Sequence, residues 1–253
     1  HVGSMGFSAR SVDQHPMNSD DRKLPRRSTQ ADVNTFLRKV AETPLTRKAG
    51  DRGRLIFALD ATASRQPTWD RACELQAEMF SETAGLGGLD IQLCYYRGFG
   101  EFKATPWSAD TGDLLRQMTG VACLGGLTQI GKVLEHTISE TEKKRVNALV
   151  FVGDCMEEEV DRLAHLAGRL GILGVPAFIF QEGHEPGAEQ AFRQIARLTN
   201  GAWCRFDASS ARQLRDLLGA VAVYAAGGRK ALTDFSAKRG GICRQLTHQV
   251  TKG

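Results

Sequence analysis

Apolar and polar positions along the chain follow one another in a pattern that predicts several strands. Segments 55–59 and 148–152 are apolar at every position, which is typical of strands buried on both faces of a sheet. The segment 89–97 alternates at first, as expected of a half-covered strand. Glycines at 98 and 100 then indicate a hairpin turn into a short antiparallel edge strand. The other strands are expected at 101–106, 175–181 and 202–206.

Helical periodicity fills the intervals between these strands. The clearest apolar stripe lies in a helix at about 29–42, and Pro44 ends it. Further helices are expected at about 67–83, 110–118, 128–144, 157–170, 187–199 and 209–225. Because helices and strands alternate, the sequence predicts a doubly wound, mostly parallel α/β sheet of six strands with one antiparallel edge strand.

Charge divides the chain into a body and two extensions. Residues 1–53 form a polar N-terminal extension with the one helix, 54–226 the α/β domain, and 227–253 a basic tail. Lys and Arg outnumber Asp and Glu by 11 to 6 over residues 1–54 and by 6 to 1 in the tail, whereas the body between has 16 against 22. A slightly acidic body argues against a nucleic-acid-binding core. The basic extensions leave RNA binding open as an alternative.

The cysteines and the apolar runs bear on location. The six cysteines are scattered without a Cys-x-x-Cys pair, which favours reduced thiols over a zinc site. No apolar run approaches the ~18 residues of a membrane helix. No charged segment followed by an apolar stretch occurs near Met5. We therefore expect a cytoplasmic protein that does not contact a membrane.

Oxygen-bearing side chains follow two of the predicted strands. Asp60, Thr62 and Ser64 come after the first strand, Asp154 ends the fourth, and Thr128 begins a helix between them. In the strand order 3-2-1-4-5-6 the first and fourth strands are neighbours, so these side chains can converge. A hard octahedral cation such as Mg²⁺ prefers oxygen ligands. The alternatives are helix caps at Asp60, Ser64 and Thr128 and a turn residue at Asp154.

The three motifs together resemble the metal-ion-dependent adhesion site of von Willebrand factor A (VWA) domains, in particular intracellular bacterial members. The family has Asp-x-Ser-x-Ser after the first strand, a Thr before a later helix and an Asp after the fourth strand. The matching segments here are Asp60-Ala-Thr62-Ala-Ser64, Gly126-Leu-Thr128 and Gly153-Asp154. The resemblance covers about residues 52–226. Two positions depart from the pattern: Thr62 replaces the first Ser, and Cys155 stands where the family often has Gly.

This resemblance implies a metal-dependent protein-binding module and not an enzyme. It implies that Mg²⁺, or another divalent cation such as Mn²⁺ or Ca²⁺, is held by Asp60, Thr62, Ser64, Thr128 and Asp154. The open position on the metal would engage an Asp or Glu of a partner protein. Bacterial relatives often work beside AAA+ ATPases, so such a partner is expected by analogy.

One further alternative is a metal-dependent phosphohydrolase on a similar sheet. A site of the haloacid dehalogenase type requires a second Asp two residues after the first, and Thr62 stands there. A dinucleotide site is not indicated, because no Gly-x-Gly-x-x-Gly follows the first strand.

Overall fold

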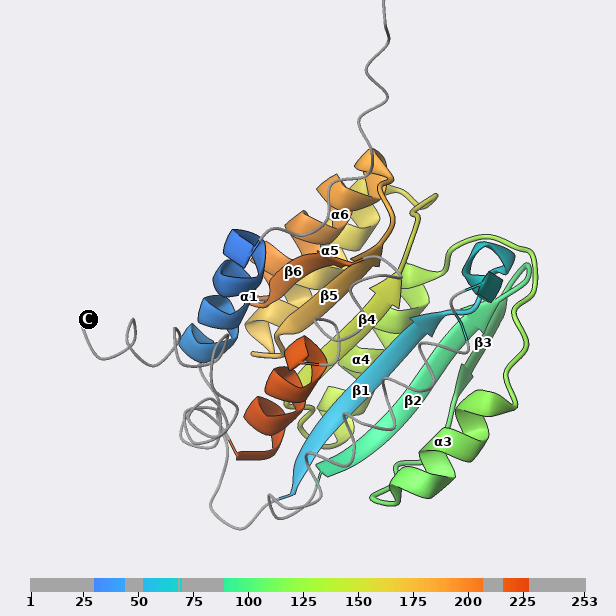
Figure 1. The fold of residues 1–253 in the computed structure, drawn as a ribbon. Helices are drawn as coiled ribbons and strands as arrows, with labels where there is room; N and C mark the ends of the chain where they lie inside the picture. Colours follow the sequence, from blue (N-terminus) through green and yellow to red (C-terminus); the bar gives the residue numbers. More distant parts are fainter. Residues whose placement is uncertain (1–29, 44–51, 68, 70–88, 207–215, 228–253) are drawn as a thin grey trace, which may run out of the picture.

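A six-stranded sheet between two layers of helices forms the body of the protein (Figure 1). The computed structural model describes residues 30–43, 52–67, 69, 89–206 and 216–227. The strand order is β3-β2-β1-β4-β5-β6. Neighbouring strands are parallel except β2 and β3, which pair in antiparallel fashion at the edge. The predicted doubly wound α/β sheet and its antiparallel edge strand are confirmed.

Most predicted elements occur within a few residues of their expected bounds. The strands are β1 (Gly53–Asp60), β2 (Leu89–Arg97), β3 (Glu101–Ala104), β4 (Ala148–Gly153), β5 (Ala177–Glu182) and β6 (Ala202–Phe206). The helices are α1 (Gln30–Glu42), the short 3₁₀ helix η1 (Ala63–Arg65), α3 (Thr111–Thr119), α4 (Ile130–Lys143), α5 (Val160–Ile172) and α6 (Pro186–Leu198). Residues 216–227 are also helical. Among the described residues, no helix has both the length and the apolar character to cross a membrane.

Some predicted segments cannot be compared. Residues 1–29 and 44–51 of the N-terminal extension, most of the helix expected at 67–83, and the tail from residue 228 lie outside the described residues. The division of the chain at residues 54 and 227 stays a prediction.

Side chains of the central strand alternate between two apolar cores. Leu55, Phe57 and Leu59 face the layer formed by α1, α3 and the helical residues 216–227. Ile56 and Ala58 face the layer formed by α4, α5 and α6. Burial on both faces explains why the segment is apolar without interruption.

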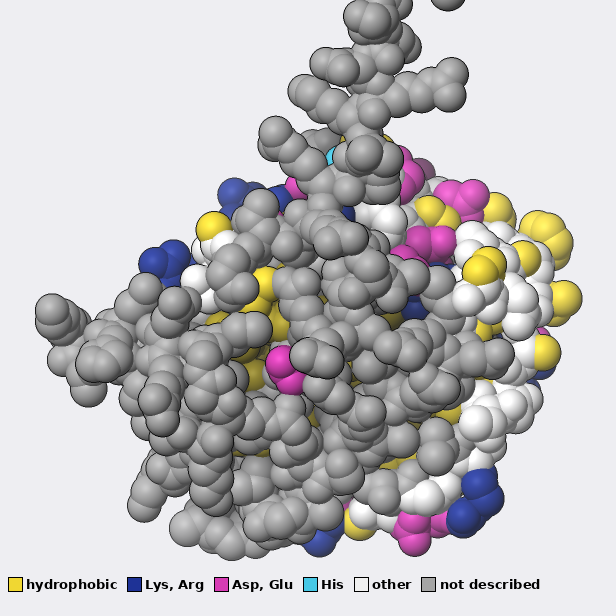
Figure 2. All heavy atoms as spheres, viewed as in Figure 1, with side chains coloured by type: hydrophobic (Ala, Val, Ile, Leu, Met, Phe, Trp, Pro, Cys, Tyr) yellow, Lys and Arg dark blue, Asp and Glu magenta, His cyan; other side chains and the backbone are white. Residues whose placement is uncertain are grey.

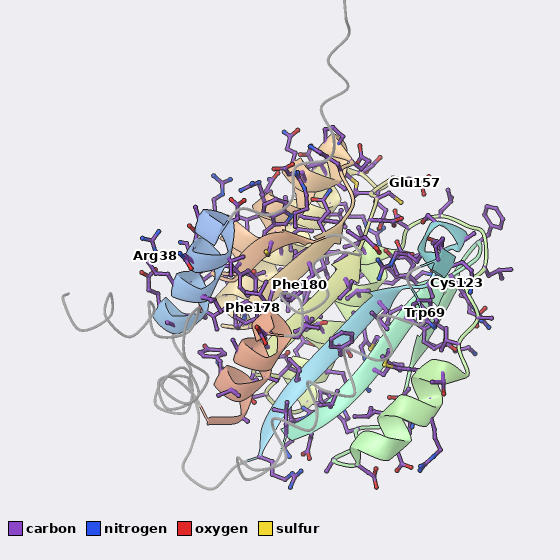
Figure 3. All side chains as sticks on the ribbon, in the orientation of Figure 1. Arg38, Trp69, Cys123, Glu157, Phe178 and Phe180 are labelled. Carbon is purple, nitrogen blue, oxygen red and sulfur yellow. The ribbon has the colours of Figure 1, made fainter. Side chains whose placement is uncertain are left out.

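Helix α1 belongs to the first of these cores. Phe36 is 1% exposed, and its ring centroid lies 5.1 Å from that of Phe180 and 6.1 Å from that of Phe178. The hydroxyl of Tyr224 donates a 3.0 Å hydrogen bond to the carbonyl of Thr43, just after the helix. Figure 3 shows Phe178 and Phe180 beneath the helix, while Arg38 points away from the sheet. The helix at the start of the chain therefore docks on the main domain.

We expect Phe36→Ala to lower the free energy of unfolding by about 3–5 kcal/mol, because it removes a buried aromatic ring from a closely packed core. The matched control is Arg38→Ala on the exposed face of the same helix, which should change stability by less than about 0.5 kcal/mol. Urea unfolding followed by circular dichroism measures both. Equal stability of the two variants would contradict the docking of α1.

Candidate metal site

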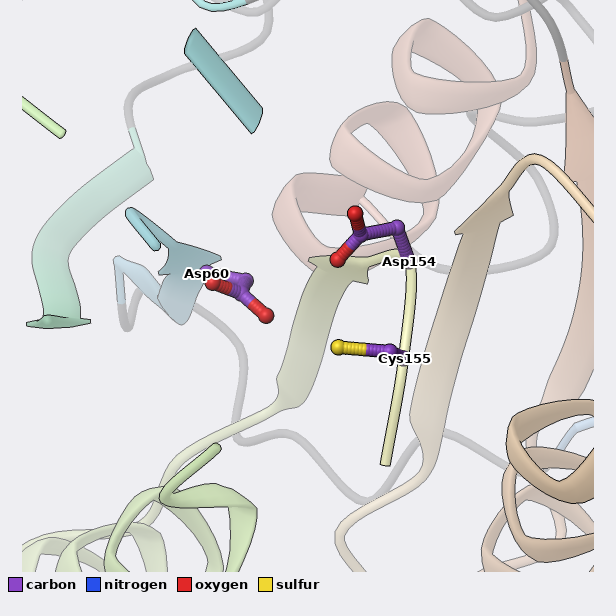
Figure 4. Close-up of side chains that lie close together, drawn as sticks. All are labelled: Asp60, Asp154 and Cys155. Atoms are coloured by element: carbon purple, nitrogen blue, oxygen red, sulfur yellow. The ribbon is translucent and has the colours of Figure 1, made fainter. Parts of the chain in front are cut away.

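Two carboxylates meet at the carboxyl ends of neighbouring strands. Asp60 is the last residue of β1, Asp154 directly follows β4, and these two strands pair in parallel. Ligand atoms of Asp60, Asp154 and Cys155 all lie within 4.8 Å of one another. Figure 4 shows the three side chains pointing toward a common space. The predicted convergence of Asp60 and Asp154 is thus found at this edge of the sheet.

Asp60 is fully buried and is held by two hydrogen bonds. Its Oδ2 accepts a 3.0 Å bond from the hydroxyl of Tyr96, and its Oδ1 accepts a 2.8 Å bond from the amide of Thr62. Burial raises the pKa of Asp60 and Asp154 adds to this, whereas the bonds from Thr62 lower it. Tyr96 was not anticipated from the sequence. Its place follows from the β1–β2 register, in which it stands opposite Asp60.

The hydroxyls of Thr62 and Ser64 lie next to each other in the same loop. Their oxygens are 3.1 Å apart, with Thr62 buried and Ser64 exposed. Thr62 occupies the N-cap position of η1, but its side chain makes no capping hydrogen bond there. Helix capping therefore does not account for the Thr62 hydroxyl.

Thr128 is tied to the loop that Asp154 begins. Its Oγ1 accepts a 3.0 Å hydrogen bond from the amide of Glu157, and its own amide donates a 3.2 Å bond to the Glu157 carboxylate. Thr128 does not cap α4, whose N-cap position is Gln129. This reciprocal pair holds Thr128 close to the Asp154 segment. The place of Thr128 in a metal shell stays a prediction.

The acidic run from Glu157 to Glu159 precedes helix α5 and is not part of it. The sequence suggests that it opens a helix at 157, but α5 begins at Val160. The carboxylate of Glu158 instead accepts hydrogen bonds from the amides of Ile130 and Gly131, the latter at 2.9 Å. It therefore satisfies amides in the first turn of α4 and complements the positive end of that helix.

A buried arginine lies beside the two aspartates. Arg65 is 1% exposed and forms an ion pair with Glu182 at the end of β5. Burial lowers the pKa of Arg65, while the charges of Asp154 and Asp60 raise it. The cluster thus has three carboxylates and one guanidinium, which leaves two negative charges when all are ionised. This role of Arg65 could not be predicted from the sequence, because an arginine in a polar loop usually lies in solvent.

Asp154 and Cys155 show which kind of cation these residues suit. Asp154 Oδ1 is buried and has no hydrogen-bond partner among the described residues. A buried carboxylate oxygen of this kind requires a compensating group, for which an ion is one candidate. Burial raises the pKa of Cys155 to about 12, and the charges of Asp154 and Asp60 and a hydrogen bond with the Asp154 carboxylate add to the shift, so the thiol stays protonated. The donors that remain are oxygens, and this set fits a hard divalent cation.

We expect Glu158→Ala to lower the free energy of unfolding by about 1–2 kcal/mol, because amides at the start of α4 lose their acceptor. The matched control is Glu159→Ala, since Glu159 is exposed and makes no capping bond with its side chain. Chemical denaturation of both variants provides the measurement. A larger loss in Glu159→Ala would show that the acidic run acts on α5 after all.

Comparisons with known proteins give a fold but no sequence family. No protein-family profile matches this chain, and no curated protein sequence matches it. Similar solved structures include the VWA domain of SpRpn10, with a TM-score of 0.53 and 15% identity over 66% of this chain and 94% of that one.

Two other solved structures are similar in fold to this chain. An aerotolerance-related membrane protein from Bacteroides fragilis NCTC 9343, with multiple mutations to serines, has a TM-score of 0.51 and 15% identity over 64% of this chain and 95% of that one. The PilB minor pilin from Streptococcus sanguinis has a TM-score of 0.54 and 11% identity over 78% of this chain and 65% of that one. The chain therefore has the fold of a von Willebrand factor A domain.

Proposed function

We propose that this protein is a metal-dependent protein-binding module. The observation that carries the proposal is the buried oxygen of Asp154, which has no partner among the described residues and lies beside the buried carboxylate of Asp60. The hydroxyls of Thr62 and Ser64 follow Asp60 in the chain, and the hydroxyl of Thr128 is hydrogen-bonded to the loop that follows Asp154. The VWA domains among similar structures share the fold that would place such a site at the edge of the sheet.

The residues have distinct roles in this proposal. Thr62, Ser64 and Thr128 offer hydroxyl oxygens that bind a cation directly. Asp60 acts through water, because both its oxygens already accept hydrogen bonds from the protein. Asp154 contributes the second negative charge. A bound Mg²⁺, Mn²⁺ or Ca²⁺ supplies a positive centre that a carboxylate from a partner protein can complete.

Two properties of the site favour binding over catalysis. Cys155, the thiol beside the aspartates, is held protonated and is therefore a poor nucleophile. The side chain of Thr62 stands where the phosphohydrolase alternative requires a second aspartate.

RNA binding is a separate alternative that rests on the basic extensions, most of which lie outside the described residues. An AAA+ ATPase as the partner and a cytoplasmic location stay predictions.

We expect calorimetric titration with MgCl₂ to show binding by the unaltered protein and about 10–100-fold weaker binding by Asp60→Asn, because the outer-shell carboxylate is lost. Ser64→Ala should weaken binding as well, since it removes a direct ligand. Ser139→Ala is the matched control, because Ser139 is an exposed serine on α4. The same titrations with MnCl₂ and CaCl₂ identify the preferred ion.

The proposal fails if the unaltered protein takes up none of the three cations. It fails equally if Ser64→Ala and Ser139→Ala bind them alike, because the hydroxyl loop would then have no part in the site.

We expect Arg65→Met to lower the free energy of unfolding without metal by about 3–5 kcal/mol, because it leaves Glu182 without this buried partner. Adding MgCl₂ should then raise the melting temperature more in this variant than in the unaltered protein, since the cation no longer competes with the guanidinium. The control is Arg145→Met, whose guanidinium donates to the carbonyl of Gly174 and does not touch the aspartates. An equal metal-induced shift in all three proteins would contradict this role of Arg65.

A further inference from the structure

Three large apolar side chains are exposed beside the proposed metal site. Phe99 is 87% exposed, and Leu124 and Leu127 are each 52% exposed. We call these three residues the apolar patch. Among the described residues, the other large exposed apolar side chains are Val160 and Ile172, both on α5. Apolar groups gathered in this way on a surface mark interaction sites.

The apolar patch is built on a well-connected backbone. The amide of Gly98 donates to the carbonyl of Leu124 at 3.3 Å, and the amide of Leu127 donates to the carbonyl of Gly98 at 3.2 Å. A Cβ added at Gly126 would lie 2.0 Å from the carbonyl oxygen of Gly98, so the two segments are in direct backbone contact. The hairpin turn between β2 and β3 and the loop before α4 therefore present their apolar side chains in a fixed arrangement.

The apolar patch is continuous with the proposed metal site. The amide of Leu124 donates a 3.0 Å hydrogen bond to the carbonyl of Ala61, the residue after Asp60. Leu127 directly precedes Thr128. A partner segment whose carboxylate reaches the metal would thus pass next to the apolar patch.

Charged side chains of both signs lie near the apolar patch. The ammonium group of Lys132 bonds neutral oxygens, the carbonyl of Gly100 at 2.8 Å and the side-chain amide of Gln129 at 2.8 Å. Glu157 and Glu159 are also exposed, and the Glu157 carboxylate accepts a hydrogen bond from the amide of Thr128. Figure 2 shows hydrophobic side chains gathered at the upper right, over the ends of β2 and β3, with acidic side chains beside them. The charge of the Lys132 ammonium group is not neutralised by these neutral oxygens, so it favours an acidic partner segment beside the apolar patch.

We propose that the apolar patch docks a partner-protein segment in which apolar side chains flank the acidic residue bound by the metal. The apolar side chains bury against Phe99, Leu124 and Leu127, while Lys132 attracts the segment's negative charge. This inference rests on the proposed metal-dependent function and specifies the class of partner sequence.

The test uses fluorescein-labelled synthetic peptides and the full chain in MgCl₂. One peptide has a single aspartate between leucines, a second has serines in place of the leucines, and a third has asparagine in place of the aspartate. Fluorescence anisotropy up to about 1 mM protein should show the leucine peptide binding at least about tenfold more tightly than the serine peptide. Phe99→Ser with Leu127→Ser should abolish that difference and leave calorimetric Mg²⁺ binding unchanged. Ile172→Ser is the control, because Ile172 is 88% exposed and lies at the end of α5.

The outcomes separate the two proposals. Mg²⁺ binding together with equal or undetectable binding of the leucine and serine peptides would overturn the docking surface and leave the metal site in place. Equal binding of the aspartate and asparagine peptides, or binding unaffected by EDTA, would overturn the metal-dependent function itself. Self-association of the chain that Phe99→Ser removes would show that a second copy, and not an acidic partner, covers the apolar patch.

Discussion

The burial of the Asp60 carboxylate, beside a half-buried Asp154, is the constraint that shapes this end of the molecule. A charged group that loses its water is unstable unless other groups compensate it. For Asp60 these groups are the Tyr96 hydroxyl and the Thr62 amide, which fix the loop after β1. The guanidinium of Arg65 adds a buried positive charge, and its ion pair with Glu182 connects the same loop to β5. The conformation of the loop is thus a consequence of the buried charge.

The segments around the proposed site support one another through contacts between distant parts of the chain. Glu157 exchanges hydrogen bonds with Thr128, and Glu158 satisfies amides at the start of α4. The loop before α4 is joined in turn to Ala61 and to the turn at Gly98. Because these loops are already held in place, they lose little conformational entropy when a partner binds, and this favours affinity. The same contacts hold the proposed metal site next to the apolar patch.

The fold was predictable because its signals are local. Continuous apolar runs identified β1 and β4, and the bounds of β2 were those expected from its alternation and the flanking glycines. The strand order then followed from general rules for α/β sheets. The start of α5 was wrong by three residues, because an acidic run ahead of an apolar stripe is also what a helix start looks like. The local pattern does not specify that the carboxylates of Glu157 and Glu158 accept hydrogen bonds at the start of α4 and in the loop before it.

The sequence by itself determined which segments form strands and helices, and it put oxygen-bearing side chains at the ends of β1 and β4. These features depend on residues near one another in the chain, where periodicity and turn chemistry act. Only the tertiary structure decided that Tyr96 binds Asp60, that Arg65 is buried against Glu182, and that Phe99, Leu124 and Leu127 share one surface. Each of these pairings requires the register of neighbouring strands and the packing of separate loops. Such information lies in contacts between distant segments, which no local pattern of apolar and polar residues can specify.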